Sequence, residues 1–445
     1  MSELGADQDD SEQDESKLVL PDEEDRADGG LDHHTLKLSR SIAVASEIMC
    51  LAFSEDGRFL LACCGDGIVR VFNPKTGVLI SLLVSKRDSA RGDGEADGAG
   101  DNERGRRAKR ASSILDNVQL PCTCAAFRPN VKVREKTSGV AVIGYSHGGF
   151  QLWHVPSAKL LHRQTVSATS EHPNSWEEAK EVHARGSVGP EEKNSYLEPV
   201  GLEILCCAYA GDGNSFAVGA SDGAVRIYSD DTKELVVELM PGVGRGSGHS
   251  SRIFSVKFHP DDNNVLVSGG WDNCVHVWDI GKATTIRTVF GPHICGDAVD
   301  VMGKTILTGS WRDDSQLQTW DIDNGEPIGP SFWAGHGKGP MLQMGAGRRC
   351  RLYAAAFGGP ERSLGRFIAA GGGEGANEVK VFDFLNDNRL VGSLLGLSAG
   401  AISLAFGEGG TRLAAGLADG QIHLVDIEAT SVAPTTSNGN TIMAF

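Results

Sequence analysis

The sequence of 445 residues lacks any apolar stretch of about 18 residues, the length that a membrane-spanning helix needs. Its first residues, MSELGADQDD, have neither a basic start nor an apolar run, so no secretory signal is expected there. The 57 glycines are scattered, which excludes collagen and favours a turn-rich β protein. Cys63, Cys64, Cys206 and Cys207 lie in apolar runs, as small core residues do in a reducing compartment. We therefore expect a soluble protein of the cytoplasm or nucleus.

Negative charge is concentrated at the N-terminus. The chain has a formal net charge of −17, and residues 1–32 alone hold thirteen acidic and two basic residues. That segment therefore carries −11 and leaves −6 for the rest. An acidic segment poor in aromatic residues cannot bury enough surface to offset its ordering entropy. We expect residues 1–33 to be a disordered acidic tail, and residues 431–445 to be a C-terminal tail.

One pattern occurs seven times: a short apolar strand, a small turn, and a second strand that usually ends in an aromatic residue. The copies are LLACCGDGIVRVF (60–72), VAVIGYSHGGFQLW (140–153), FAVGASDGAVRIY (216–228), LVSGGWDNCVHVWDI (266–280), ILTGSWRDDSQLQTWDI (306–322), FIAAGGGEGANEVKVFDF (367–384) and LAAGLADGQIHLVDI (413–427). In each copy the turn residue and the strand-end residue are six apart. Such strands, with frequent turns and no helical periodicity, indicate an all-β fold. Seven small sheets arranged radially leave only short, protected edges.

The fourth copy carries the fullest signature, which consists of Gly248-His249, Ser268, Asp272 and Trp278-Asp279. On this signature and spacing, residues 34–430 resemble the WD-repeat family of β-propellers. The resemblance implies a seven-bladed propeller whose blade four has a hydrogen-bonded structural tetrad, made of His249, Ser268, Asp272 and Trp278. It also implies that residues from about 35 to 43 supply the outer strand of blade seven and close the ring.

Two insertions lengthen the connections between blades, at about 86–117 and 167–200. The resemblance places both on the face that carries the turn aspartates, and loops on a rigid scaffold commonly carry binding. Trp176 and Tyr196 in the second insertion are candidate protein-binding residues. In the first, five basic residues precede Ser112. Three interpretations of this basic run stay open: a solvated loop, a phosphorylation site at Ser112, and a nuclear-import or RNA-contacting patch.

Two further tryptophans, Trp271 and Trp311, lie in the turns before a strand-end tryptophan in blades four and five. An exposed tryptophan on a propeller rim is a candidate anchor for a protein partner. The alternative is that each ring packs over its neighbouring blade and needs no partner. Both are kept as protein-binding candidates.

Strings that look catalytic lack the context that catalysis needs. Residues 219–223 match G-x-S-x-G, but a strand follows where a nucleophile elbow needs a helix. Gly303-Lys304-Thr305 ends like a phosphate loop without its upstream glycine. Cys122 and Cys124 have no second pair nearby to complete a zinc site. We therefore expect no enzyme, and no catalytic, cofactor or metal site.

The expected function is a non-catalytic scaffold or adaptor. It would bind other proteins or peptides on the loop-rich face, as a monomer within a larger complex. One alternative is a substrate receptor of a cullin-RING ubiquitin ligase, although Ile280-Gly281 follows Trp278-Asp279 where such receptors carry Asp-x-Arg/Lys. Another is an enzyme with a site at the central mouth. One short basic patch and an acidic balance argue against nucleic acid as the main ligand, and no membrane contact is expected.

Overall fold

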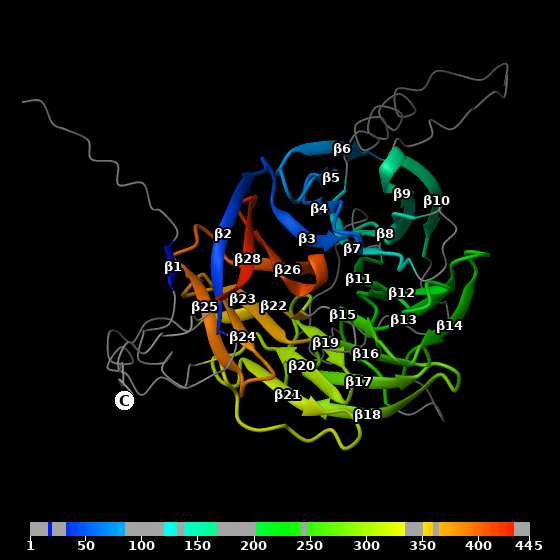
Figure 1. Cartoon of the computed structure of the whole chain (residues 1–445). Coiled ribbons are helices and arrows are strands. Elements are labelled where there is room, and N and C mark those ends of the chain that lie inside the picture. The colour runs from blue at the N-terminus through cyan, green and yellow to red at the C-terminus, as the bar shows by residue number, and fades with distance from the viewer. Residues whose placement is uncertain are drawn as a thin grey trace, which may run out of the picture.

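The computed structural model describes residues 17–19, 33–84, 120–130, 138–166, 202–241, 247–333, 350–358 and 365–430. These residues form seven antiparallel sheets arranged radially around one axis (Figure 1). They include two short 3₁₀ turns, Val155–Ser157 and Glu408–Gly410, and no α-helix. The prediction of an all-β, seven-bladed propeller is therefore confirmed.

Each blade is a meander whose first strand lies nearest the axis. The inner strands are β3 (Ile48–Phe53), β7 (Cys122–Phe127), β11 (Ile204–Tyr209), β15 (Ile253–Phe258), β19 (Val299–Met302), β22 (Arg351–Gly358) and β26 (Ala401–Gly407). The second strands are β4 (Leu60–Cys64), β8 (Val140–Tyr145), β12 (Ser215–Ala220), β16 (Val265–Gly270), β20 (Thr305–Gly309), β23 (Phe367–Gly373) and β27 (Arg412–Leu417).

The third strands carry the strand-end residues of the repeat. They are β5 (Val69–Phe72), β9 (Gly149–His154), β13 (Val225–Ser229), β17 (Cys274–Asp279), β21 (Leu317–Asp321), β24 (Glu378–Asp383) and β28 (Gln421–Thr430). The outer strands are β6 (Leu79–Leu83), β10 (Lys159–Thr165), β14 (Leu235–Leu239), β18 (Thr284–Phe290), β25 (Arg389–Leu395) and β2 (His33–Ala43). Blade five has no outer strand among the described residues. The bridge between Trp320 and Pro327 and backbone hydrogen bonds of residues 326–332 lie along the outer edge of β21 instead.

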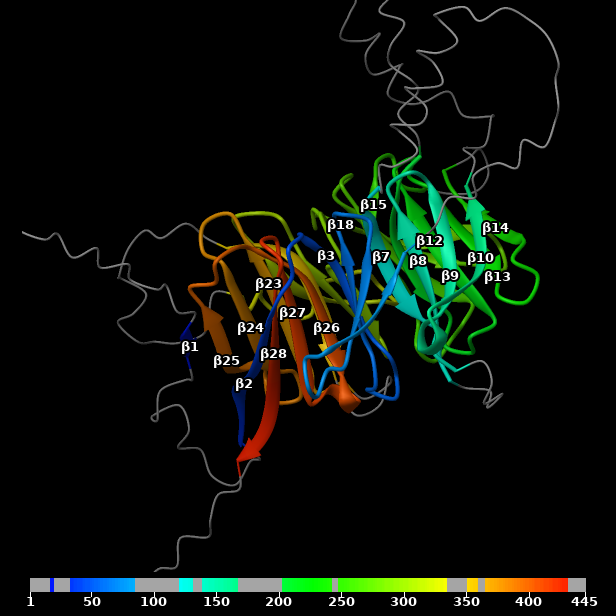
Figure 2. The ribbon, with the colours of Figure 1, turned by 90° about the horizontal axis from the view of Figure 1, so that it is seen from above.

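Blade seven joins the two ends of the repeat region. β2 pairs antiparallel with β28 over ten residue pairs, from His33 opposite Thr430 to Ala43 opposite Gln421. Figure 2 shows the ring edge-on, with β2 and β28 side by side. The next strand of the chain, β3, is the inner strand of blade one, so this pairing holds the first and last blades together.

Three residues of the segment 1–33, for which the composition predicts disorder, form a strand. β1 (Lys17–Val19) pairs antiparallel with β25 as a fifth strand of blade six, and Leu18 lies opposite Leu394. They lie at the one run of consecutive large apolar residues in the tail, LVL at 18–20. Because β-sheet edges accept such segments, the general acidity of the tail does not prevent pairing there. Residues 1–16 and 20–32 lie outside the described residues.

Adjacent blades pack closely because glycine stands near the end of most second strands. A Cβ on Gly416 of β27 would lie 2.6 Å from Cγ2 of Ile48 in blade one. A Cβ on Gly219 of β12 would lie 3.0 Å from Cγ2 of Ile253 in blade four. Any side chain there would displace the neighbouring inner strand. This need for close approach accounts for part of the high glycine content.

Candidate binding face

One face of the ring, here called the turn face, carries the turns between second and third strands. It also carries the segments that lead into the inner strands. In six blades a backbone N–H of the turn donates to a carbonyl of that segment. The donor and acceptor pairs are Gly65 to Glu47, Ser146 to Pro121, Ser221 to Glu203, Trp271 to Arg252, Trp311 to His293 and Ala418 to Gly400. These bonds make the turn face a rigid surface.

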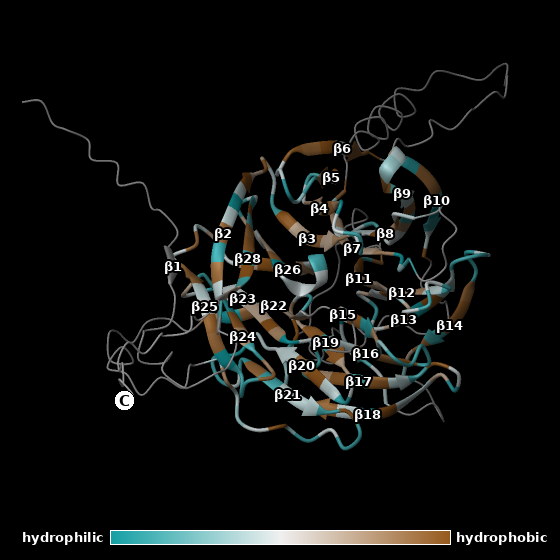
Figure 3. Ribbon diagram, viewed as in Figure 1, coloured by the Kyte–Doolittle hydropathy of each residue, from teal (hydrophilic) through white to brown (hydrophobic). Residues whose placement is uncertain are grey.

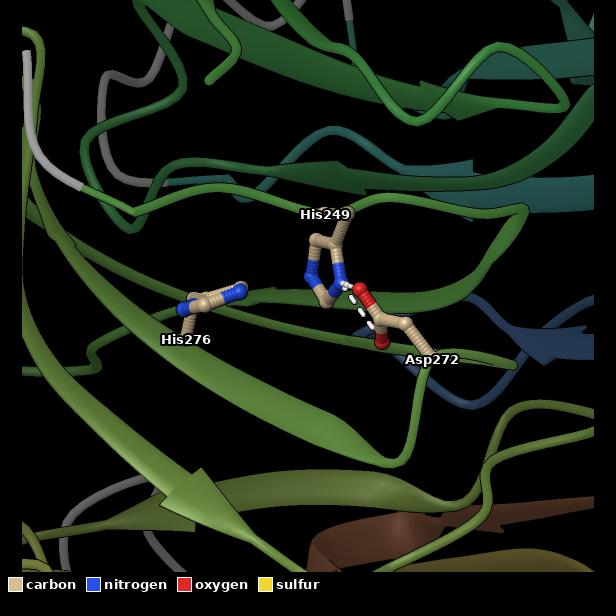
Figure 4. Close-up of side chains that lie close together, drawn as sticks. All are labelled: His249, Asp272 and His276. Carbon is tan, nitrogen blue, oxygen red and sulfur yellow. Dashed lines mark hydrogen bonds and ion pairs between the residues drawn. The ribbon is translucent and has the colours of Figure 1, made fainter. Parts of the chain in front are cut away.

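The turn of blade four is fixed by a chain of side-chain hydrogen bonds. His249 Nδ1 donates to Asp272 Oδ2 at 2.9 Å (Figure 4). Its Nε2 lies 2.8 Å from Ser268 Oγ. Trp278 Nε1 donates to the same Ser268 Oγ at 2.8 Å. Burial opposes ionisation of Asp272, but His249, the backbone N–H of Ser250 and His276 together outweigh it and hold the pKa of Asp272 below its usual range.

His276 lies against this chain of hydrogen bonds. Its ring centroid is 4.5 Å from that of His249, its Nδ1 is 2.9 Å from Thr288 Oγ1, and its buried Nε2 has no hydrogen-bond partner. Ligand atoms of His249, Asp272 and His276 all lie within 4.8 Å of one another, a spacing compatible with a metal ion. However, both ring nitrogens of His249 are already engaged by Asp272 and Ser268. A cation held by all three residues would have to break these bonds.

Blades one and three fix their turns in a way that the sequence analysis missed. Arg70 donates to both carboxylate oxygens of Asp66, at 3.0 and 2.6 Å. In blade three Arg226 donates to both oxygens of Asp222 and also lies 2.8 Å from Glu238. Burial disfavours the charge of Arg226, but these carboxylates outweigh it and leave its pKa raised. The signal was present, because an arginine follows the turn aspartate by four residues in both copies.

Trp271 is the most prominent side chain of the turn face in blade four. It is 41% exposed, and its ring stacks on Phe254 of β15 with a centroid distance of 5.2 Å and an interplanar angle of 30°. The guanidinium of Arg252 lies 5.7 Å from the Trp271 ring centroid and forms an ion pair with Glu203 of blade three. The ring is therefore held in place while about two fifths of the residue stays open to solvent.

Trp311 is placed differently. Its ring lies 4.0 Å from that of Tyr353 in blade six, and Arg351 lies 5.8 Å from its ring centroid. Arg351 in turn pairs with Asp313 at 3.0 Å and Glu374 at 2.7 Å. Trp311 thus packs across the boundary between blades five and six, and less of it is available to a partner than of Trp271.

The two tryptophans belong to one surface because a single segment joins their turns. Ile294 N donates to Gly270 O at 3.1 Å, and Trp311 N donates to His293 O at 2.8 Å. Residues 293–294 therefore bridge the turns of blades four and five. We call the surface made by Arg252, Trp271, Trp311, Arg351 and Glu374 the Trp–Arg surface.

Around the axis, one position of the inner strands is alanine in five of the seven blades. It precedes the terminal aromatic residue, as Ala52 precedes Phe53. The equivalent residue is Lys257 in blade four and Asp300 in blade five. Lys257 Nζ donates to Asp297 at 2.8 Å, and both oxygens of Asp300 accept backbone N–H groups. Burial disfavours the charge of Lys257, but Asp297 and Asp300 outweigh it and raise its pKa.

Three of the residues singled out from the sequence lie outside the described residues. They are Ser112, Trp176 and Tyr196, in the insertions at about 86–117 and 167–200. These residues stay predictions.

Comparison with known proteins places the chain among repeat proteins. The family described as WD domain, G-beta repeat matches residues 37–73, 200–229 and 243–279. WD repeat-containing protein 1 of Gallus gallus is 32% identical over 85 residues, which are 19% of this chain and 13% of that protein. Periodic tryptophan protein 2 homolog of Caenorhabditis elegans is 21% identical over 339 residues, 70% of this chain and 36% of that protein. Guanine nucleotide-binding protein subunit beta of Zea mays is 26% identical over 125 residues, 27% of this chain and 33% of that protein.

These alignments cover between 13% and 36% of the relatives' own lengths. The match at 243–279 contains all four residues of the blade-four tetrad, and the match at 37–73 runs from β2 through the third strand of blade one. Among the described residues, no helix is long and apolar enough to cross a membrane.

Proposed function

Because the chain is a WD-repeat protein with the fold of a seven-bladed β-propeller, we propose that it is a non-catalytic scaffold that binds proteins or peptides on its turn face. The observation that carries this proposal is Trp271, a large ring that is 41% exposed yet fixed between Phe254 and Arg252. A ring that is already ordered loses little conformational entropy when a partner covers it. Tryptophan and arginine are also the residues most enriched at energetically dominant contacts.

The charges of the Trp–Arg surface indicate what kind of segment would fit it. Arg252 is paired with Glu203, and Arg351 is paired with Asp313 and Glu374, so acidic and basic groups alternate around the two rings. A partner segment with one apolar or aromatic anchor and flanking charges of both signs would complement this pattern. Trp176 and Tyr196 would add contacts from the second insertion.

Near the axis, Lys257 lacks the electrostatics of a general base. A lysine that acts as a general base needs a lowered pKa, whereas Asp297 and Asp300 raise the pKa of Lys257. Both carboxylate oxygens of Asp300 accept hydrogen bonds, one from the backbone N–H of Val301 and one from that of Phe357. This cluster acts as a clamp between blades four, five and six, and the remaining blades present alanine at the same position.

The cullin-RING receptor is the second candidate, and blade four does not favour it. Where such receptors carry a basic residue, this chain has Gly281, whose N–H donates to Asn264 Oδ1 at 2.7 Å. We also propose residence in the cytoplasm or nucleus within a larger complex. All ten cysteines are unpaired and eight are buried, which suits a reducing compartment.

The test compares the intact chain with Trp271→Ala by affinity purification and mass spectrometry. The matched control is Phe290→Ala, which removes an exposed aromatic ring from the outer strand of the same blade. Phe290→Ala should keep the wild-type Tm because its ring is 74% exposed, whereas Trp271→Ala also removes the stacking on Phe254 and should lower the Tm slightly. Partners are therefore compared well below both Tm values. Partners lost with Trp271→Ala and kept with Phe290→Ala support the proposal. Partners that survive both substitutions would remove the Trp–Arg surface as the binding site.

A further inference from the structure

The outer strand of blade one exposes an uncharged, mostly apolar stretch. Between Val78 and Val84 there is no charged residue, and five large side chains are exposed, from 37% at Val84 to 61% at Val78. Figure 3 shows β6 as a brown strand on the outer rim of the ring. β6 pairs with β5 on one side only, so its other edge presents unpaired backbone groups among the described residues.

Other outer strands carry charges that discourage edge-to-edge pairing. These charged residues are Lys37 and Arg40 in β2, Lys159 and Arg163 in β10, Glu238 in β14 and Arg287 in β18. The exception besides β6 is β25, which is uncharged from Leu390 to Leu395. The second half of that stretch is covered, because β1 pairs with residues 393–395. In this molecule an uncharged outer edge therefore accepts a further strand, and among the described residues β6 is the uncharged edge without one.

We propose that β6 pairs with β6 of a second copy of this chain, which forms a two-fold symmetric dimer. The stretch is self-complementary when two copies run antiparallel around Ser81. Val78 then faces Val84, Leu79 faces Leu83, and Ile80 faces Leu82, so apolar residues meet apolar residues on both sides of a central pair of Ser81 residues. No like charges oppose each other, and cross-strand pairs of this kind stabilise antiparallel sheets. The same patch on both subunits is what a closed two-fold interface requires.

Ring closure does not prevent such a dimer. The pairing of β2 with β28 completes the circle of blades, but it leaves the outermost strand of each blade facing solvent. The monomer expected from the sequence does not exclude this dimer, because a closed ring does not cover the outer edges of its blades. The proposed interface also lies on the outer rim of blade one, whereas the Trp–Arg surface lies on the turn face of blades four to six. Each proposal can therefore fail without the other.

The first test measures the mass of the full chain by light scattering after size-exclusion chromatography, over a range of protein concentrations. We expect a mass of twice 47.1 kDa that falls toward the monomer on dilution. Ile80→Lys combined with Leu82→Lys places charge on the edge and should give a monomer at every concentration. The matched control, Val236→Lys on the exposed outer strand β14, should stay dimeric. Because the substituted side chains are all exposed, all three proteins should share one Tm at dilutions where the wild type is a monomer.

Hydrogen exchange distinguishes strand pairing from any other dimer. Amide protection of residues 78–84 should rise with protein concentration in the wild type and not in the double variant. A wild-type chain that stays monomeric at high micromolar concentration overturns the proposal, even if a different protein binds this edge. A dimer that persists in the Ile80→Lys, Leu82→Lys variant overturns it as well. Trp271→Ala should leave the dimer unchanged, which keeps this test separate from that of the turn face.

Discussion

The guanidinium of Arg226 holds the carboxylate of Asp222, four residues before it, with hydrogen bonds of 3.2 and 2.7 Å. Arg70 holds Asp66 in the same way in blade one. In blade four the turn aspartate, Asp272, is held by His249. Three blades thus fix the same turn, two of them with an arginine and one with a histidine. The turn aspartate is the shared element, and its partner differs from blade to blade.

Replacing Arg226 by methionine should lower the free energy of unfolding by about 3 kcal/mol, because breaking a buried ion pair leaves its partners uncompensated. Here Arg226 is almost wholly buried, and the substitution would strand Asp222 and Glu238. Urea unfolding measures the change. Arg58→Met is the control, since Arg58 pairs with Asp56 at the surface and such pairs contribute about 0–1 kcal/mol. Equal losses in the two variants would contradict the structural role of Arg226.

Ser268→Ala tests the tetrad of blade four. Ser268 Oγ contacts both His249 Nε2 and Trp278 Nε1, and all three side chains are buried. Removing the hydroxyl leaves the Trp278 N–H without an acceptor, which costs about 1–3 kcal/mol for a buried donor. Urea unfolding should show a loss in that range, whereas Ser157→Ala, at an exposed position beside His154, should be neutral. A neutral Ser268→Ala would mean that the tetrad adds no stability.

The sequence was sufficient for the fold because the repeat is local. The turn residue and the strand-end residue are six positions apart in every copy, and this spacing alone predicts seven hairpins. The ring follows once the hairpins are arranged radially. The environment of Trp311 could not be predicted in this way, because its ring packs on Tyr353, 42 residues later in the next blade. A contact between blades depends on how two repeats pack, and no spacing within one repeat encodes it.

The apolar edge of blade one was missed for a related reason. An apolar run such as VLISLLV suggests a buried strand when it is seen in sequence alone. Its exposure follows from its place as the fourth and outermost strand of the sheet, which only the topology reveals. The Arg226–Asp222 pair was within reach of sequence reasoning, since both residues lie in one hairpin. It is not part of the family signature, which consists of His, Ser, Asp and Trp and is complete only in blade four.

Gly416→Ala should destabilise the contact that closes the ring. The new Cβ would lie 2.6 Å from Cγ2 of Ile48, so blade one would have to move away from blade seven. Overpacking of this kind costs about 1–3 kcal/mol. The control is Gly65→Ala, where the nearest atom is 3.5 Å away on the side chain of Glu47. Thermal unfolding should show a lower Tm for Gly416→Ala only, and an unchanged Tm would show that this blade boundary can relax.

His276 should make the protein less stable as the pH falls. Burial, followed by the neighbouring His249, lowers the pKa of His276 to about 4 in the folded chain, against about 6.5 in an unfolded one. Between these values the unfolded state binds the proton more tightly, so the free energy of unfolding decreases as pH falls through this range. The total loss below pH 4 is about 3 kcal/mol for this one group.

His276→Gln isolates this contribution, because a glutamine cannot titrate there. The pKa values of His293 and His423 are also lowered by burial, so the variant should keep part of the pH dependence. Urea unfolding of both proteins at pH 7.0, 6.0, 5.0 and 4.5 should give curves that separate progressively, with the wild type losing more. Burial is the main physical reason, followed by His249, and together they outweigh Asp272 and the backbone of Gly248, which favour the protonated ring. Parallel curves would mean that an acceptor reaches Nε2 in solution, and that the protonated ring is tolerated beside His249.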